Sequence, residues 1–287
     1  MDGNDYSMRS LQVLSAAGIG SDLLLRTPAR SDGVWLYWLP AMGVPARNYA
    51  PLAEALAARG VGLALHEWRG LGSSSVRAGR NENWGYRELL TQDVPAGLAI
   101  ARKACPEARW LIGGHSLGGQ LASLFAGLQP ETVDGLVLVA SGAPYWRCFP
   151  RWSVPLRLAY GLAPGIARLR GHFPGRRIGF GGNEARGVIA DWAHSGRRGR
   201  YAARGLSWDL DDALQAQKAP VLALRLVDDA FGPRASLQYL LDRMPRAISE
   251  THALDAEDLG NRPDHFSWMK TPEAVARHIA DWSDRLR

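Results

Sequence analysis

The segment 110–125, WLIGGHSLGGQLASLF, constrains the fold more than any other part of the chain. A short apolar run, typical of a buried strand, leads through glycines and one serine directly into a segment that is apolar again. The pentapeptide GHSLG, residues 114–118, fits the pattern G-x-S-x-G, in which a sharp turn exposes the serine above a sheet edge. Such a turn strains the backbone, and flanking glycines avoid the clashes that side chains would cause. The sequence therefore predicts a strand, a turn that presents Ser116, and a helix.

Short apolar segments alternate with amphipathic segments along most of the chain. The expected strands are residues 34–39, 62–66, 110–113, 136–140, 221–227 and 247–252. The expected helices are residues 49–59, 87–103, 117–128, 233–243 and 272–282. This alternation is typical of the α/β class, in which helices flank a mostly parallel central sheet.

Residues 145–217 break the alternation, because prolines, glycines and arginines interrupt the apolar runs. We expect this part, called the cap segment below, to be inserted between the strands at 136–140 and 221–227, while residues 1–144 and 218–287 form the core. Four tryptophans are spread through it, and they could line a pocket or pack onto the sheet: Trp146, Trp152, Trp192 and Trp208. The basicity behind the net charge of +6 is concentrated here, since residues 145–208 contain twelve arginines, no lysine and two acids.

A serine hydroxyl is a weak nucleophile, so it needs a base, and the base needs an orienting partner. His265 is the predicted base, because it lies in a polar loop between the last strand and the last helix, at the same sheet edge as Ser116. His252 is the second candidate. The acid is expected directly after the strand at 221–227, where Asp228 and Asp229 are adjacent. Asp229 is favoured because it stands four residues before Pro233, the D-x-x-x-P pattern of similar enzymes, and Asp228 remains the alternative acid.

With serine, acid and histidine in this chain order, the sequence resembles the α/β-hydrolase superfamily. Residues 39–61, LPAMGVPARNYAPLAEALAARGV, are similar to the family's first loop and helix, although the family usually has His-Gly where this chain has Pro40 and Ala41. The resemblance implies an oxyanion hole made by the backbone amides of Met42 and Leu117. Residues 66–75, HEWRGLGSSS, resemble the D-x-R-G-x-G-x-S loop, which supports the site, with Glu67 at or near the aspartate position.

The resemblance also implies the chemistry, which is cleavage of a carboxylic ester or thioester through an acyl-enzyme on Ser116. Two alternatives stay open: an acyltransferase on the same triad, or a non-catalytic binding protein with this fold. Dehalogenase and epoxide hydrolase chemistry is set aside, because those relatives have an aspartate at the position of Ser116. The expected substrate is a small ester or thioester, with acyl-CoA and acyl-carrier-linked thioesters among the candidates.

No cofactor and no metal site are expected, because no cluster of His, Cys and carboxylates has metal-ligand spacing, and Cys105 and Cys148 are expected to be ordinary thiols. Nucleic acid is not an expected partner, since no binding motif is present. The arginines of the cap segment are expected to be a solvated face or to bind an anionic group, such as a CoA phosphate, a phosphopantetheine or a lipid headgroup. The sequence shows no signal peptide and no transmembrane segment, which favours the cytoplasm, and a homodimer is left open.

Overall fold

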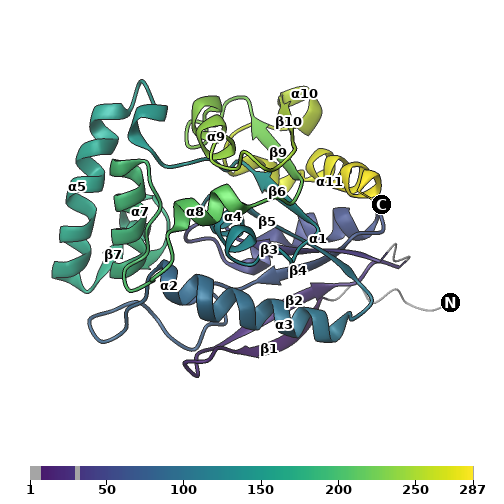
Figure 1. The fold of residues 1–287 in the computed structure, drawn as a ribbon, viewed down its shortest axis with the longest axis horizontal. Helices are drawn as coiled ribbons and strands as arrows, with labels where there is room; N and C mark the ends of the chain where they lie inside the picture. Colours follow the sequence, from purple (N-terminus) through teal and green to yellow (C-terminus); the bar gives the residue numbers. More distant parts are fainter. Residues whose placement is uncertain (1–7, 30–32, 287) are drawn as a thin grey trace.

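The computed structural model describes residues 8–29 and 33–286, and an eight-stranded sheet forms its centre (Figure 1). The strand order is β1-β2-β4-β3-β5-β6-β9-β10. The strands are β1 (Arg9–Leu14), β2 (Gly20–Arg26), β3 (Val34–Leu39), β4 (Gly62–His66), β5 (Arg109–His115), β6 (Gly135–Val139), β9 (Val221–Leu226) and β10 (Ser249–Leu254). Residues 1–7, where the sequence shows no signal peptide, lie outside the described residues.

Six strands, from β4 to β10 in this order, are parallel to one another, whereas β2 pairs antiparallel with both β4 and the edge strand β1. All six expected strands are present, and their ends differ from the expected ones by at most two residues. Strands β1 and β2 were not expected, because their apolar pattern is weak: only Val13 of β1 is buried. By contrast, all six residues of β3 are buried, as is usual for a central parallel strand covered on both faces.

Helices cover both faces of the sheet. Helices α1 (Ala50–Ala57) and α11 (Glu273–Arg285) pack on one face, around a core that includes the indole rings of Trp38 and Trp268. Helices α3 (Val94–Ala104), α4 (Leu117–Leu128), α8 (Leu210–Ala216) and α9 (Arg234–Leu241) contribute buried side chains to the core on the other face. The sequence-based prediction of an α/β fold with a mostly parallel sheet is therefore confirmed.

The helix expected at residues 87–103 is interrupted. It consists of α2 (Tyr86–Glu88), one π-helical turn at Leu89–Asp93 and α3. Pro95 lies in the first turn of α3 and has no N–H to donate to a carbonyl of the preceding turn. A proline is well tolerated at the start of a helix, so the proline and the π-helical turn account for the division.

The cap segment runs from the end of β6 to the start of β9 (Figure 1). It contains α5 (Ser153–Arg170), β7 (His172–Pro174), α6 (Gly175–Ile178), β8 (Asn183–Ala185), α7 (Arg186–Arg198) and α8. The sequence analysis gives no helix candidate among these interrupted apolar runs, yet α5 continues for 18 residues through Pro164. Helices α5 and α7 pack together, with the rings of Tyr160 and Trp192 in edge contact at 4.7 Å. No helix in residues 8–29 or 33–286 combines the length and apolarity needed to cross a bilayer.

We predict opposite effects on stability for two glycine-to-alanine substitutions in helices. Gly127 of α4 faces α8, and a Cβ there would overlap the backbone carbonyl of Ala213, so Gly127→Ala should lower the free energy of unfolding by about 1–3 kcal/mol. At Gly161 of α5, a Cβ would meet no other atom within 4 Å. Gly161→Ala should therefore raise the free energy of unfolding by roughly 0.5–1 kcal/mol. Urea unfolding measures both, and a stabilising Gly127→Ala would contradict the close packing of α4 and α8.

Candidate active site

Ser116 lies at the turn between β5 and α4, with backbone angles φ 55° and ψ −120°. This conformation is strained for a residue with a side chain, and it persists only where the surroundings fix it. The Ser116 N–H donates to the carbonyl of Val139, and the hydroxyl of Ser141 donates to the carbonyl of Ser116. A Cβ on Gly118 would overlap the carbonyl oxygen of Leu39, so this position requires glycine. The predicted strand, turn and helix are thus present, and the glycine permits close backbone packing.

His265 and Asp229 are in hydrogen-bond contact, with 2.8 Å between His265 Nδ1 and Asp229 Oδ2. Both side chains are buried. The second carboxylate oxygen of Asp229, Oδ1, accepts hydrogen bonds from the backbone N–H groups of Phe231 and Gly232 at 2.8 and 2.9 Å. Because a carboxylate oxygen accepts hydrogen bonds, His265 Nδ1 is the donor in this contact, and Nε2 is the ring nitrogen left for other contacts.

The two alternative candidates lie elsewhere. Asp228 is exposed, and its backbone N–H donates to the carbonyl of Pro263, whereas the carboxylate bonded to His265 is that of Asp229. His252 lies on β10, where its Nε2 is 2.6 Å from a carboxylate oxygen of Glu250 and its ring is 4.5 Å from that of His278. Neither residue lines the pocket that contains Ser116. The geometry therefore brings Asp229 and His265 together and leaves Asp228 and His252 apart.

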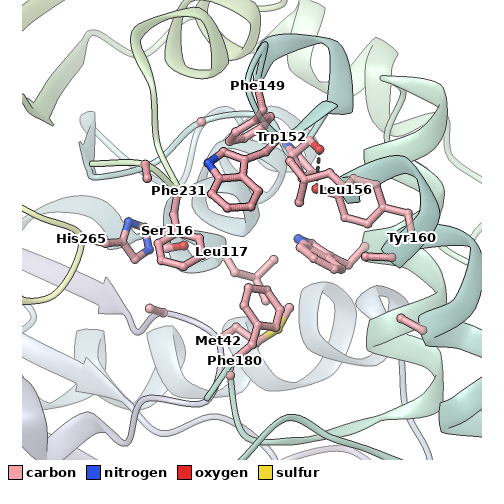
Figure 2. A pocket seen from close by; sticks show the side chains of 18 of the residues that line it. Met42, Ser116, Leu117, Phe149, Trp152, Leu156, Tyr160, Phe180, Phe231 and His265 are labelled. Carbon is pink, nitrogen blue, oxygen red and sulfur yellow. Dashed lines mark hydrogen bonds between the residues drawn. The ribbon is translucent and has the colours of Figure 1, made fainter. Parts of the chain in front are cut away.

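Ser116 and His265 line a common pocket of about 520 Å³ between the core and the cap segment (Figure 2). Figure 2 shows the two side chains at the same wall, with aromatic and aliphatic side chains around the rest of the cavity. Of the four tryptophans in the cap segment, Trp152 and Trp192 line the pocket. The other two do not: Trp146 contacts the guanidinium groups of neighbouring arginines, and Trp208 is mostly exposed. The volume is in the range of small-molecule sites.

Met42 and Leu117, the residues implied as oxyanion-hole donors, both line this pocket with Ser116. Leu117 is the first residue of α4, so its N–H has no acceptor within the helix and lies at the positive end of the helix dipole. Met42 belongs to a β-turn in which the Val44 N–H donates to the carbonyl of Ala41, with Gly43 at φ 74°. Both residues therefore lie at the same pocket as Ser116, and the role of their amides as oxyanion donors stays a prediction.

Two buried side chains fix the loop that contains Met42. The indole Nε1–H of Trp68 donates to the carbonyl of Pro40 at 2.8 Å, and the N–H of Ala41 donates to the Tyr49 hydroxyl at 2.9 Å. Pro40 and Ala41 are the two positions at which this chain differs from the His-Gly of the resembled family. Hydrogen bonds with Trp68 and Tyr49 therefore stabilise this loop, although the chain lacks the His-Gly pair.

Tyr49 also connects this loop to the turn at Ser116, a connection that sequence reasoning missed. Its hydroxyl is 2.9 Å from Nδ1 of His115, the residue before Ser116. Burial raises the pKa of Tyr49 well above its usual value, so the hydroxyl keeps its proton while it is hydrogen-bonded to both the Ala41 N–H and the His115 ring. Burial, and then the neighbouring His265, lower the pKa of His115 well below its usual value, so this imidazole is neutral.

The neutral ring of His115 packs behind the ring of His265, with 4.7 Å between their centroids, and it is fully buried. Tyr49 and His115 therefore position the turn and the imidazole of His265 rather than line the pocket. The sequence offers no signal for this pairing, because Tyr49 has the pattern of an ordinary apolar helix residue and lies 66 positions from His115.

Glu67, which the resemblance places in a supporting loop, is buried, and its Oε1 accepts a hydrogen bond from the Ala46 N–H at 3.2 Å. Burial raises the pKa of Glu67 above its usual value. This contact ties the loop after β4 to the segment after β3. Cys105 and Cys148 are both free thiols, and no group of three or more metal-ligand side chains is assembled within the described ranges.

Comparisons with known proteins bear on the fold. The profile of a family described as serine aminopeptidase, S33, matches residues 37–171, somewhat less than half of the chain. No curated protein matches the chain at a significant level. An esterase from Pyrococcus furiosus is similar in structure, with 15% identity and a TM-score of 0.62 over 99% of this chain and 96% of that one. Est1E from Butyrivibrio proteoclasticus with ferulic acid bound has 15% identity and a TM-score of 0.64 over 96% of this chain and 99% of that one. A thermostable carboxyl esterase from Bacillus coagulans has 14% identity and a TM-score of 0.63 over 98% of this chain and 99% of that one. At these identities the similarity establishes the fold.

We predict that Tyr49→Phe slows ester turnover, the activity expected from the sequence. The substitution leaves the Ala41 N–H and His115 Nδ1 without partners in a buried place, which should lower the free energy of unfolding by about 1–3 kcal/mol. It also removes a hydrogen bond that holds the loop of Met42. A displacement of a catalytic group near 1 Å can lower the reaction rate 10²-fold, so kcat should fall about tenfold or more with little change in KM.

A matched control is Tyr37→Phe, which removes a hydroxyl 2.8 Å from Nδ1 of His66, another buried tyrosine–histidine pair. The hydrogen bond lost here goes to His66 and not to the loop of Met42, so this variant should lose stability while kcat stays near the wild-type value. Equal effects on kcat in the two variants would contradict a positioning role for Tyr49.

Proposed function

The chain has the fold of the α/β-hydrolase superfamily, and from this premise we propose that it is a serine hydrolase that cleaves an ester with an apolar acyl group. The observation that supports the proposal most is the His265–Asp229 hydrogen bond in a pocket that Ser116 also lines. The esterases among the structurally similar proteins agree with it. The fold alone does not decide the chemistry, because many functions occur on one fold.

In the proposed mechanism, Ser116 Oγ attacks the ester carbonyl carbon while Nε2 of His265 accepts the hydroxyl proton. Asp229, already bonded at Nδ1, stabilises the imidazolium that forms. The carbonyl oxygen becomes an oxyanion, which accepts hydrogen bonds from the amides of Met42 and Leu117. The tetrahedral intermediate expels the alcohol, which takes the proton from His265 Nε2, and an acyl-Ser116 ester remains. Water, deprotonated by His265, then releases the acid and restores the serine.

The pocket favours an apolar acyl group over a peptide N-terminus. None of the residues that line it is an aspartate or glutamate, whereas an aminopeptidase needs an anionic or strongly polar group to bind a free ammonium. The polar lining groups are few, and two of them are already bonded: the Tyr160 hydroxyl donates to the Pro144 carbonyl, and Gln120 Oε1 accepts from the Tyr201 hydroxyl. An alkyl or aryl chain therefore fits the cavity better than a charged one. A thioester with the same acyl group is an equivalent substrate for this chemistry.

We predict that catalysis depends on Ser116, His265 and Asp229. Ser116→Ala should abolish labelling by a fluorophosphonate probe, because the probe bonds to an activated serine oxygen. His265→Ala and Asp229→Asn should each lower kcat/KM for a p-nitrophenyl ester by roughly 10³-fold or more. The matched controls His252→Ala and Asp228→Asn change the same residue types outside the pocket and should stay near the wild-type value. Equal labelling of the native protein and Ser116→Ala would remove Ser116 from the role of nucleophile.

We also predict that a substitution in the pocket changes the preference for the length of the substrate's acyl chain. Ala159 of α5 lines the pocket, and its exposed position tolerates a larger side chain. Ala159→Phe should lower kcat/KM for long-chain p-nitrophenyl esters by about tenfold or more and leave the acetate nearly unchanged, because the added ring occupies apolar volume. Leu162→Phe, on the same helix but outside the pocket lining, is the control. The panel should include acyl-CoAs and leucine p-nitroanilide; turnover of the anilide above the esters would favour peptidase chemistry.

A further inference from the structure

Helix α5 has two apolar faces, of which only one is buried. Its inner face packs against the rest of the cap segment through Tyr160, Ala163 and Ala167. A second row of side chains, between 40% and 77% exposed, follows the outer surface of the helix: Val154, Leu158, Leu162, Ile166 and Leu169. Their spacing of three or four residues keeps them on one side of the helix over roughly 22 Å. We call these five residues the outer row. Figure 1 shows α5 at the periphery of the molecule.

The outer row adjoins the mouth of the pocket. Pro155, next to the first residue of the row, lines the pocket, and so do four large apolar side chains that are about half exposed or more. These four are Trp152, Ile178, Phe231 and Phe266. Single exposed apolar residues are ordinary, but a contiguous surface of this kind usually marks a contact site. Pro155 therefore lies between the outer row and the pocket mouth, whose exposed apolar side chains are together called the apolar surface.

Arginines border this surface, and acids do not neutralise them. On α5, helical geometry places Arg157 and Arg168 on one flank of the outer row and Arg170 on the other, and all three are exposed. Exposed Arg176 and Arg177 precede Ile178 at the pocket mouth. Of the twelve arginines in residues 145–208, only Arg200 makes a salt bridge within the described part of the chain. The two acids of that range point inward: Asp191 is buried and bonded to the Tyr86 N–H, and Glu184 is bonded to the Gly182 N–H.

We propose that the outer row and its flanking arginines bind the surface of an anionic lipid bilayer, with the pocket mouth facing the lipid. A bilayer surface accepts an apolar row lying in its plane, while guanidinium groups bind the lipid phosphates. A second copy of the chain fits less well, because an apolar contact between two such faces would bring their unpaired arginines together without acids. The proposal deepens the proposed function, since a surface-bound enzyme would take acyl esters directly from the lipid.

The test uses the full chain carrying Ser116→Ala, so that binding is measured without turnover. Flotation is compared for vesicles of equal parts phosphatidylglycerol and phosphatidylcholine and for vesicles of phosphatidylcholine alone. We expect binding to the anionic vesicles to be at least tenfold tighter and to weaken as salt is raised. Equal binding to both, or no binding to either, would overturn the proposal. Because the nucleophile is absent, this result does not depend on whether the proposed hydrolysis is correct.

Variants separate the two parts of the surface. Leu158→Ser with Leu162→Ser should weaken binding to anionic vesicles at least tenfold, and Arg157→Gln with Arg168→Gln should weaken it about fivefold per arginine. Ile248→Ser and Arg246→Gln are the matched controls, since both residues are exposed in the loop before β10, at the amino ends of the parallel strands. They should bind as well as the parent.

Two further measurements keep these variants interpretable. None of the four substituted α5 residues lines the pocket, so with Ser116 restored each variant should hydrolyse a soluble p-nitrophenyl ester at the parent rate, which shows that it is folded. Light scattering is recorded without lipid. A dimer that becomes a monomer in Leu158→Ser with Leu162→Ser would identify the outer row as a protein interface and overturn the lipid assignment.

Discussion

The candidate site depends on how closely the backbone of α4 approaches the carboxyl end of β3. The first turn of α4 packs so tightly against the end of β3 that a side chain at Gly118 would overlap the Leu39 carbonyl. This contact, with the hydrogen bonds of Ser116 to the end of β6 and to Ser141, fixes the strained backbone of Ser116. Strain of this kind costs on the order of 1–3 kcal/mol, and the packing of the surrounding core offsets that cost. As a result, the serine, the loop of Met42 and the start of α4 meet at one point.

Polar groups around this point form a short chain of contacts inside an apolar core. Tyr49 joins the Ala41 N–H to His115, the ring of His115 packs on that of His265, and His265 bonds to Asp229. Each of these side chains is buried. Because unpaired buried polar groups are costly, these hydrogen bonds fix the orientations of the bonded side chains, and with them the loop of Met42 and the ring of His265. The site is therefore positioned by the same contacts that stabilise the ends of the parallel strands.

The cap segment adds what the core cannot provide. Its aromatic and aliphatic side chains close the pocket on the side away from the sheet, so that the environment of Ser116 is largely apolar. The same helix, α5, carries apolar residues on its outside and arginines on both flanks. One inserted segment thus accounts for the shape of the cavity and for the chemical character of the surface around its mouth.

The sequence by itself determined the local elements: the strand, turn and helix around Ser116, the six parallel strands and the loop that contains His265. These follow from apolar periodicity and glycine placement, which act between near neighbours in the chain. It did not reveal the antiparallel strands β1 and β2, where few residues are buried, or the continuity of α5 through Pro164.

Only the tertiary structure shows that, of the adjacent Asp228 and Asp229, it is Asp229 whose carboxylate is hydrogen-bonded to His265. It alone showed that Tyr49 and His115 meet and that α5 has an unburied apolar row. The physical reason is that these relations depend on packing between residues far apart in the chain, which local propensity does not encode.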